Sequence, residues 1–493
     1  METKSIFEAP PARGPIPAEP SVISPALVVD LDGTLLKTDL LLESLLVLLK
    51  HKPLCIFLLP IWLLKGKAYL KRQIASRVEM DVSVFPYRSE LVDYLTMQRR
   101  AGRCIVLATA SDTRFARQVA DHLNIFELLF ASDGITNLAG TAKRDRLVSV
   151  FGARGFDYAG SGPADLPVWG AARKAILVNR NPSLKARLAR NSQVDWLFEQ
   201  PKRGVLDFLQ PLRFRHWLKN VLVFVPLLAA QRLLQVELLE KAILAFVAFG
   251  CCASAGYVIN DLFDLAADRH HPDKRLRSFA AGDLPISYGL ATVPVLVAIG
   301  CAIGSLVSPL FLALLLTYFA MTMAYSFHLR KVVLLDVIVL ASLYTMRILA
   351  GSASIEIWPS HWLLAFSTFL FLSLALVKRY GELVIMRRID GESAMARGYQ
   401  LSDGELLSAM GVASGFLAVL VLALYINSDT APALYGRFEL IWFLCPLLLY
   451  WISHIWLVAH RGKMPDDPLV FATHDTVSRI LIALMGAITV LAL

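Results

Sequence analysis

The segment from 260 to 277, NDLFDLAADRHHPDKRLR, gathers acidic and basic side chains directly after an apolar run. If one helix continues through it, Asn260, Asp264 and Asp268 lie on one stripe, because residues four apart share a helix face. Asp261 lies on the flank of this stripe. Carboxylates crowded at a helix end repel one another unless a cation joins them, and oxygen ligands without a cysteine or histidine pattern suit Mg²⁺. The segment therefore predicts that its aspartates bind Mg²⁺.

The basic residues of the same segment indicate what such a metal would bind. Lys274, Arg275 and Arg277 are residue types that bind and neutralise phosphate oxygens. Protein-bound Mg²⁺ commonly keeps substrate phosphates among its ligands. The spacing predicts a Mg²⁺–diphosphate site where the apolar run ends. The alternative is a solvated helix end whose charges form ordinary surface ion pairs.

A second pair of carboxylates follows an apolar stretch near the N-terminus, in ALVVDLDGTLLKTD. Asp30 and Asp32 are separated by one residue, so at the end of a strand they point the same way, because strand side chains repeat with period two. Two such carboxylates can hold Mg²⁺, and one of them can attack phosphorus. The stretch therefore predicts phosphoryl chemistry at the C-terminal end of a β-strand.

The pattern DxDGT resembles the first motif of the haloacid dehalogenase superfamily of phosphatases. The resemblance implies a Rossmann-like α/β fold in which Asp30 is the nucleophile and a Mg²⁺ ligand, and Asp32 is the acid/base. It further implies that Thr109, in CIVLATAS, binds phosphate, and that Lys143, in NLAGTAKRDRL, is the cation of the third motif.

The fourth motif of that family is incomplete here. In FDYAGSGPADLPVW, Ser161 stands at the first acidic position, and Asp165 is the remaining metal ligand. The resemblance covers about 26–195 and leaves two interpretations open: a working phosphatase, or a weakened or purely structural domain.

The overall composition divides the chain into two parts. Of its 493 residues, 56% are hydrophobic, with a mean hydropathy of +0.55, which is unusual for a soluble protein. Beyond about residue 210, apolar runs of roughly 20 residues recur, each long enough to cross a bilayer. We predict an all-α bundle of about nine transmembrane helices over 211–493, the first of them near 217–231. A linker is predicted over 196–210, and a Pro-rich disordered lead over 1–25.

Within the N-terminal part, the segment from about 40 to 90 contains apolar runs broken by Lys50, His51 and Lys52, too short to span a bilayer. It is either a helical cap packed on the domain or a hairpin whose apolar face dips into the bilayer surface.

The chain has a net charge of +9, but its basic residues are distributed as in a membrane protein and do not indicate nucleic-acid binding. Basic residues cluster in the connections after the even-numbered predicted spans, which follows the positive-inside rule. The N-terminal domain is therefore predicted to be cytoplasmic, on a multi-pass protein of the inner (plasma) membrane.

The pattern NDxxDxxxD at the end of the second predicted span resembles the UbiA superfamily of membrane prenyltransferases. That resemblance implies a nine-helix bundle that binds a diphosphate through two aspartate-rich loops. The second loop departs from the family pattern DxxxD, because Asp336 is followed four residues later by Leu340, with Arg347 nearby.

The pattern from Tyr257 to Arg277, together with RHWLKNVLVF and LVKRYGEL, is similar to the decaprenylphosphoryl-5-phosphoribose synthases. The similarity implies transfer of 5-phosphoribose from phosphoribosyl diphosphate to a polyprenyl phosphate. Lys219 would then stabilise the departing pyrophosphate together with the basic residues of 274–277, and Asn260 would ligate the metal or hydrogen-bond the ribose. The remaining residues expected to contact substrate are Asp336, Arg347, Lys378 and Arg379.

Several alternatives stay open. The fused phosphatase could remove the ribose 5-phosphate of the product. The bundle could instead move a prenyl group from a prenyl diphosphate to an aromatic acceptor, or act as a scaffold or transporter. Asp466 and Asp467 form either a solvated turn or a further ligand of the same cavity. The sequence leaves the oligomeric state open.

Overall fold

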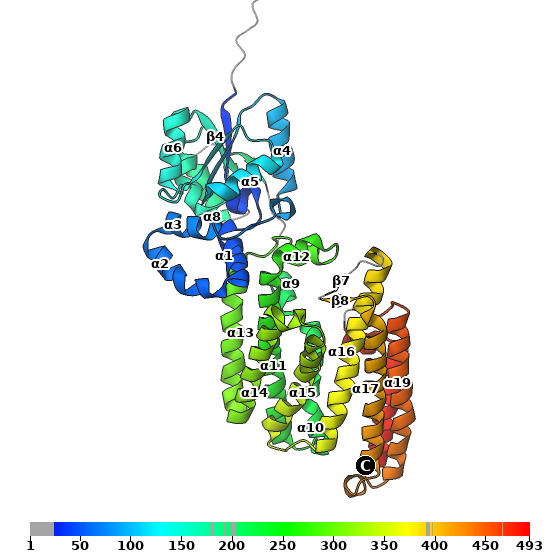
Figure 1. The fold of residues 1–493 in the computed structure, drawn as a ribbon. Coiled ribbons are helices and arrows are strands. Elements are labelled where there is room, and N and C mark those ends of the chain that lie inside the picture. The colour runs from blue at the N-terminus through cyan, green and yellow to red at the C-terminus, as the bar shows by residue number, and fades with distance from the viewer. Residues whose placement is uncertain are drawn as a thin grey trace, which may run out of the picture. The chain divides into compact units, whose positions relative to one another are not determined.

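The computed structural model describes residues 24–178, 182–191, 194–198, 204–390, 395–396, 398–465 and 467–493. The chain separates into two compact units, Met1–Lys202 and Arg203–Leu493 (Figure 1). The predicted disordered lead falls almost wholly on residues 1–23, which lie outside the described residues, as does Asp466.

A six-stranded parallel sheet forms the centre of the N-terminal unit, in the order β3-β2-β1-β4-β5-β6. Strand β1 reads ALVV and is buried throughout, as expected for a parallel strand covered by helices on both faces. The strand order reverses between β1 and β4, the place where open α/β sheets bind ligands. The predicted α/β class is confirmed for this unit. The strands are β1 Ala26–Val29, β2 Ile105–Asp112, β3 Leu128–Ser132, β4 Phe156–Gly160, β5 Ala175–Leu177 and β6 Val194–Leu197.

The segment between β1 and β2 forms helices that pack on this sheet. Its residues Leu48, Trp62 and Ile74 belong to the same buried apolar cluster as Leu27 and Val29 of β1. One face of the segment therefore covers the domain core. Its helices are α1 Leu40–His51, α2 Leu59–Leu64, α3 Lys67–Ala75 and α4 Ser89–Arg100; α5 Thr113–Leu123, α6 Thr141–Phe151, α7 Leu166–Ala171 and α8 Pro182–Asn191 follow between and beyond the later strands.

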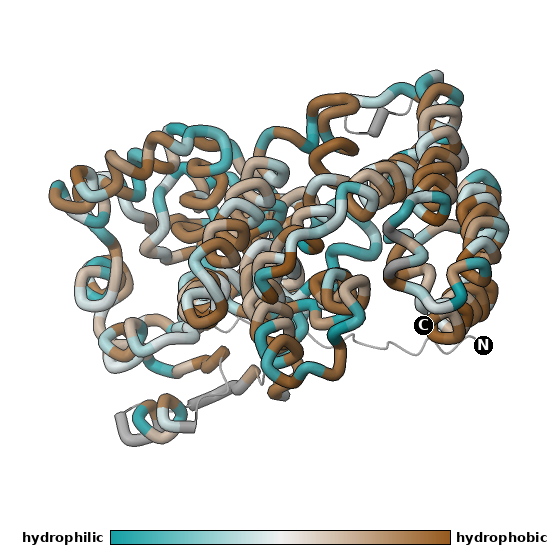
Figure 2. Tube along the Cα trace, turned by 90° about the horizontal axis from the view of Figure 1, so that it is seen from below, coloured by the Kyte–Doolittle hydropathy of each residue, from teal (hydrophilic) through white to brown (hydrophobic). Residues whose placement is uncertain are grey.

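The C-terminal unit is a helical bundle rich in apolar residues (Figure 2). Within the described residues, seven helices are long and apolar enough to cross a membrane, or eight if the pair α20–α21, bent by 87°, is one span. Two of them, α11 and α15, are central, because 67% and 72% of the residues in their apolar stretches are buried. The main helices are α11 Val236–Phe263, α13 Ile286–Val307, α14 Pro309–Phe327, α15 Leu335–Ile355, α16 His361–Asp390, α17 Asp403–Ile426, α19 Leu444–His460, α20 Pro468–His474 and α21 Thr476–Ala492.

The first predicted span, 217–231, is not one long helix. A 3₁₀ segment, Phe214–Phe224, is followed by the short helix α10, Val225–Ala229. Pro226 at the start of α10 lacks the N–H that would continue an α-helical ladder from the preceding turn. The 3₁₀ backbone packs against α15 at Gly351, where a Cβ would lie 2.1 Å from the Val223 carbonyl oxygen.

A fully buried ion pair joins α15 to α16. Arg379 Nη2 lies 2.5 Å from Asp336 Oδ2, and neither side chain is exposed. The Tyr399 hydroxyl donates a 2.5 Å hydrogen bond to Asp336 Oδ1, and Arg379 also pairs with Glu382. Asp336 and Arg379, both predicted to contact substrate, therefore contact each other in the interior of the bundle.

This pair gives a stability prediction. Replacing Asp336 with Ala would remove one of the two carboxylates that neutralise the buried Arg379 and leave Glu382 as the other, so the loss should lie below the cost of a fully unpaired buried charge but reach about 2 kcal/mol or more. Thermal unfolding of the purified protein in detergent would measure the loss. Glu356→Ala, which breaks an exposed pair with Lys241, is the control and should change stability by less than about 1 kcal/mol. Equal effects of the two substitutions would contradict a structural role for the buried pair.

Candidate functional site

The acidic motif at the end of α11 is divided by a break in the helix. Helix α11 ends at Phe263, Asp264 adopts φ −104° and ψ 14°, and α12 runs from Leu265 to His270. The predicted stripe of Asn260, Asp264 and Asp268 assumed a continuous helix. The break instead turns Asp264 to a different partner from the one that Asp261 and Asp268 share.

Asp261 and Asp268 converge on one guanidinium group. Arg277 Nη1 lies 3.2 Å from Asp261 Oδ1 and 2.7 Å from Asp268 Oδ2. Arg213 adds a second cation, with Nη2 at 2.5 Å from Asp261 Oδ1. Both carboxylates are only 6% exposed. Asp261 lies on α11 and Asp268 on α12, so carboxylates from both sides of the break contact the same guanidinium group.

Asp264 forms a separate, two-pronged pair. Arg330, in the 3₁₀ turn Leu329–Lys331 after α14, donates from Nη1 and Nη2 to the two carboxylate oxygens at 2.9 and 3.0 Å. This parallel arrangement is the strong form of the arginine–carboxylate pair. It ties the end of α11 to the connection between α14 and α15.

The positions of these aspartates indicate which of them could hold the predicted Mg²⁺. Across the described ranges, no group of three or more His, Cys, Asp and Glu side chains is placed to hold a metal ion. Asp261 and Asp268 nevertheless point their oxygens at a single positively charged nitrogen. A cation between these two carboxylates fits the donor set, whereas Asp264 is directed elsewhere.

The other predicted residues of this segment lie on either side of Asp261 and Asp268 in the sequence. Asn260 is half-buried at the end of α11, next to Asp261. Lys274 and Arg275 lie in the 3₁₀ turn Lys274–Leu276, with Lys274 half-buried and Arg275 exposed. Arg275 is open to solvent, and a role of Lys274 and Arg275 in anion binding stays a prediction.

A second polar cluster lies inside the bundle. Lys219 forms an ion pair with Asp467, and its ammonium lies 5.8 Å from the centre of the Tyr344 ring. Arg347 hydrogen-bonds to Asn220 Oδ1 at 3.1 Å and to the Tyr318 hydroxyl at 2.7 Å. Ionisable groups inside a membrane bundle commonly mark a functional pathway. The charge of Lys378 also acts on the Asp467 carboxylate, so Lys378 lies near this cluster.

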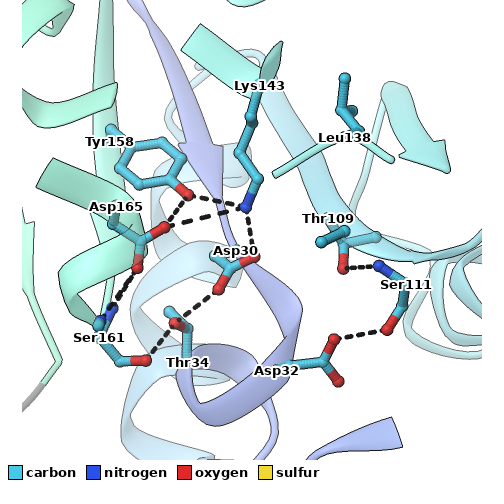
Figure 3. A network of polar contacts seen from close by, with 12 residues as sticks. Asp30, Asp32, Thr34, Thr109, Ser111, Leu138, Lys143, Tyr158, Ser161 and Asp165 are labelled. Carbon is cyan, nitrogen blue, oxygen red and sulfur yellow. Dashed lines mark hydrogen bonds and ion pairs between the residues drawn. The ribbon is translucent and has the colours of Figure 1, made fainter. Parts of the chain in front are cut away.

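In the N-terminal unit, the carboxyl ends of β1, β2 and β4 bring the predicted residues together (Figure 3). Lys143 Nζ lies 2.7 Å from Asp30 Oδ1, 3.0 Å from the Tyr158 hydroxyl and 3.9 Å from Asp165 Oδ1. Burial raises the pKa of Asp30, and the Lys143 charge opposes that rise. Asp30, Lys143 and Asp165 thus share one buried network.

The two oxygens of the Asp165 carboxylate accept hydrogen bonds, one from Tyr158 and the other from the loop that follows β4. Its Oδ1 accepts from the Tyr158 hydroxyl at 2.6 Å, and its Oδ2 accepts from the backbone N–H groups of Ser161 and Gly162 at 3.0 Å. Ser161, in place of an acidic residue, accepts a 2.9 Å hydrogen bond from Thr34. This donor set does not fit the predicted Mg²⁺ site of Asp30 and Asp165.

Asp32 lies beside Asp30 and faces β2. Its Oδ1 accepts from the Leu40 N–H at 2.9 Å, and its Oδ2 accepts from the Ser111 hydroxyl at 2.5 Å. Burial, followed by the charge of Asp39, raises the pKa of Asp32 to about 7. Thr109 is buried and accepts from the Ser111 N–H at 3.0 Å. Asp32 can therefore carry a proton near neutral pH.

Among the partners in these networks that were not predicted as site residues are Arg213, Arg330, Tyr158 and Ser111. Arg213 and Arg330 are far from residues 261–268 in sequence, so no local spacing links them. The one signal for Tyr158 is its place in a buried strand two residues before Gly160, on the strand that precedes the loop of Ser161.

Long apolar helices joined to a cluster of paired carboxylates and arginines define this chain as an integral membrane protein with an ionic site at its helix ends. The model of the UbiA prenyltransferase family matches residues 221–474, just over half of the chain. The chain belongs to this family and is therefore a transferase.

Three relatives show how far the similarity extends. The chain is 36% identical over 470 residues to uncharacterized protein y4nM of Sinorhizobium fredii, covering 95% of this chain and 91% of that protein. It is 38% identical over 280 residues to nodulation protein NoeC of Azorhizobium caulinodans, covering 56% and 90%. It is 31% identical over 305 residues to decaprenyl-phosphate phosphoribosyltransferase of Mycobacterium tuberculosis, covering 59% and 97%.

The pKa of Asp32 gives a pH prediction. Between about pH 4 and about pH 7 the folded carboxyl keeps a proton that the unfolded chain has lost, so stability falls as pH rises. Asp32→Asn cannot ionise and should remove this loss. Thermal unfolding at the two ends of that range should show the variant gaining stability relative to wild type as pH rises. A pH-independent difference would contradict the prediction.

Proposed function

We propose that the C-terminal unit transfers 5-phosphoribose from phosphoribosyl diphosphate to a polyprenyl phosphate, with Mg²⁺ held by Asp261 and Asp268. The observation that carries the proposal is the convergence of these two carboxylates on one cationic nitrogen, beside a second arginine. Its support from relatives is the alignment with nearly the whole length of a decaprenyl-phosphate phosphoribosyltransferase.

The reaction needs charge stabilisation more than proton transfer. The bond from the ribose anomeric carbon to the diphosphate breaks with its electron pair on the departing oxygen, and an anionic oxygen of the polyprenyl phosphate forms the new bond. Bound Mg²⁺ would supply positive charge to the leaving group. Arg213, Arg277 and Lys274 are the residues of this chain that would neutralise the released pyrophosphate.

In the second half of the bundle, the sequence around Asp336 lacks the second aspartate of the DxxxD pattern. This supports binding of the phosphoribosyl donor through the aspartate cluster at 261–268. Asp336 is engaged by Arg379 and Tyr399 in the interior, and Leu340 stands where a second carboxylate would be needed. Lys219 and Arg347, buried with polar partners, would hold a phosphate of the sugar or of the lipid. A prenyl diphosphate donor and an aromatic acceptor are the alternative that the assay below separates.

We expect Asp261→Ala and Asp268→Ala each to lower phosphoribosyl transfer by roughly 100-fold or more, because each removes a charge-stabilising ligand. The measurement is transfer of labelled phosphoribose from phosphoribosyl diphosphate to decaprenyl phosphate by the purified protein with Mg²⁺.

Asp273→Ala is the matched control, because Asp273 is an exposed carboxylate of the same segment; its activity should match wild type. Transfer of a prenyl group to an aromatic acceptor, with no phosphoribosyl transfer, would contradict the proposal.

We further propose that the N-terminal unit is a haloacid dehalogenase-like phosphatase that removes the 5-phosphate of the lipid-linked product. Asp30 would attack phosphorus, and Asp32, whose pKa is near neutral, would give its proton to the departing sugar oxygen. Water would then cleave the aspartyl phosphate, with Asp32 as the base. Lys143, at 2.7 Å from Asp30, would neutralise the phosphate.

Asp30→Asn should abolish release of inorganic phosphate from the ribose 5-phosphate lipid, because the amide cannot form the covalent intermediate. Phosphate release by full-length protein is the measurement. Asp145→Asn, at an exposed carboxylate on α6, should have no effect. Phosphate release that is equal in wild type and Asp30→Asn would show that this site does not catalyse hydrolysis.

A further inference from the structure

The segment Pro53–Leu64 of the N-terminal unit is apolar on two opposite faces. It consists of a 3₁₀ turn, Pro53–Leu58, that leads into α2. Cys55, Leu59 and Trp62 form its inner face and pack on the buried cluster of the domain core. Three residues separated by four and three positions share one helical face, so the inner face accounts for only part of the apolar surface.

The outer face carries Leu54, Phe57, Ile61 and Leu64, spaced by three, four and three residues. Their exposed fractions are 77%, 74%, 51% and 88%. A helix that is apolar all round is normally covered all round, and an exposed group of large apolar residues of this kind marks an interaction surface. We call these four residues the apolar face.

The charge around the apolar face is exclusively basic. No Asp or Glu lies between Glu43 and Glu79, whereas this interval holds seven Lys and Arg residues together with one His. The basic residues at the two ends of the segment are Lys50, His51, Lys52, Lys65 and Lys67. Apolar side chains flanked by basic ones are the pattern of an element that lies in the interface of an anionic bilayer.

We propose that the apolar face inserts into the headgroup–acyl boundary of the bilayer that the transmembrane helices of the same chain cross. The chain joins the N-terminal unit covalently to that membrane unit, so the apolar face meets bilayer lipid at high effective concentration. Anionic lipid complements the basic ends. A second copy of the segment does not, because two equally positive surfaces repel each other.

The two helices that flank this segment reach the proposed phosphatase site. Helix α1, which leads into it, begins at Leu40, whose N–H donates to Asp32. Helix α3, which leaves it, carries Lys71, whose ammonium donates to the Ala110 carbonyl at 2.6 Å and to Asn137 at 2.9 Å. Membrane insertion would therefore hold the site next to a lipid-borne phosphate; this step rests on the proposed phosphatase, whereas insertion itself does not.

The test is photolabelling of the full-length protein in nanodiscs of phosphatidylcholine and phosphatidylglycerol that contain a phospholipid with a photoreactive acyl chain. Mass spectrometry of the peptides should find label on 53–64 in the wild type. Leu54→Glu/Phe57→Glu/Leu64→Glu should reduce that label to the level of the peptide that contains Ile135, while label on the transmembrane helices stays unchanged.

Ile135 provides the matched control, because it is 92% exposed in the same unit but is not part of the apolar face. Ile135→Glu should leave labelling of 53–64 unchanged. The proposal would be overturned if label on 53–64 of the wild type were no stronger than label on the Ile135 peptide. This result does not depend on whether the triple variant folds. The phosphate-release assay is independent of the labelling.

Discussion

Pairing of carboxylates with arginines is the interaction on which the membrane unit depends. Charges at or near the bilayer are costly unless they are neutralised, and here each acidic residue of the motif is paired with an arginine. Asp268 pairs with Arg277 of the same segment, whereas Asp261 and Asp264 also have arginine partners from distant parts of the chain. Asp264 with Arg330 joins α11 to the connection after α14, and Asp336 with Arg379 joins α15 to α16. The first of these contacts lies beside the site at which we propose that an anionic substrate binds.

In the N-terminal unit the equivalent constraint is backbone geometry. Parallel strands end at one edge of a sheet, so residues that are more than 100 positions apart, such as Asp30 and Lys143, become neighbours. Burial at that edge raises the pKa of both Asp30 and Asp32, but the partners of the two carboxylates differ. Asp30 is held by a lysine, whereas Asp32 is held by neutral donors and has a pKa of about 7. One carboxylate is thereby suited to attack and the other to proton transfer.

The sequence predicts the features that depend on local periodicity. Apolar runs identify most of the long helices, and the DLD pattern places two carboxylates at a strand end. The predictions fail where a local break in a helix, or a partner far away in the sequence, determines the structure. Pro226 divides the first predicted span, and the backbone of Asp264 divides the predicted stripe. Arg213 and Arg330 could not be assigned, because an ion pair between distant segments leaves no spacing to detect.

The shared contact of Arg277 with Asp261 and Asp268 has a consequence for the thermodynamics of ligand binding. In the proposed function, a Mg²⁺ ion held between these carboxylates would displace the Arg277 guanidinium, and a diphosphate oxygen would accept the hydrogen bonds that this group loses. The two ligands should then increase each other's affinity by the same factor, since linkage is reciprocal. A site built in this way stays electrically balanced when empty and discriminates against either ligand arriving alone.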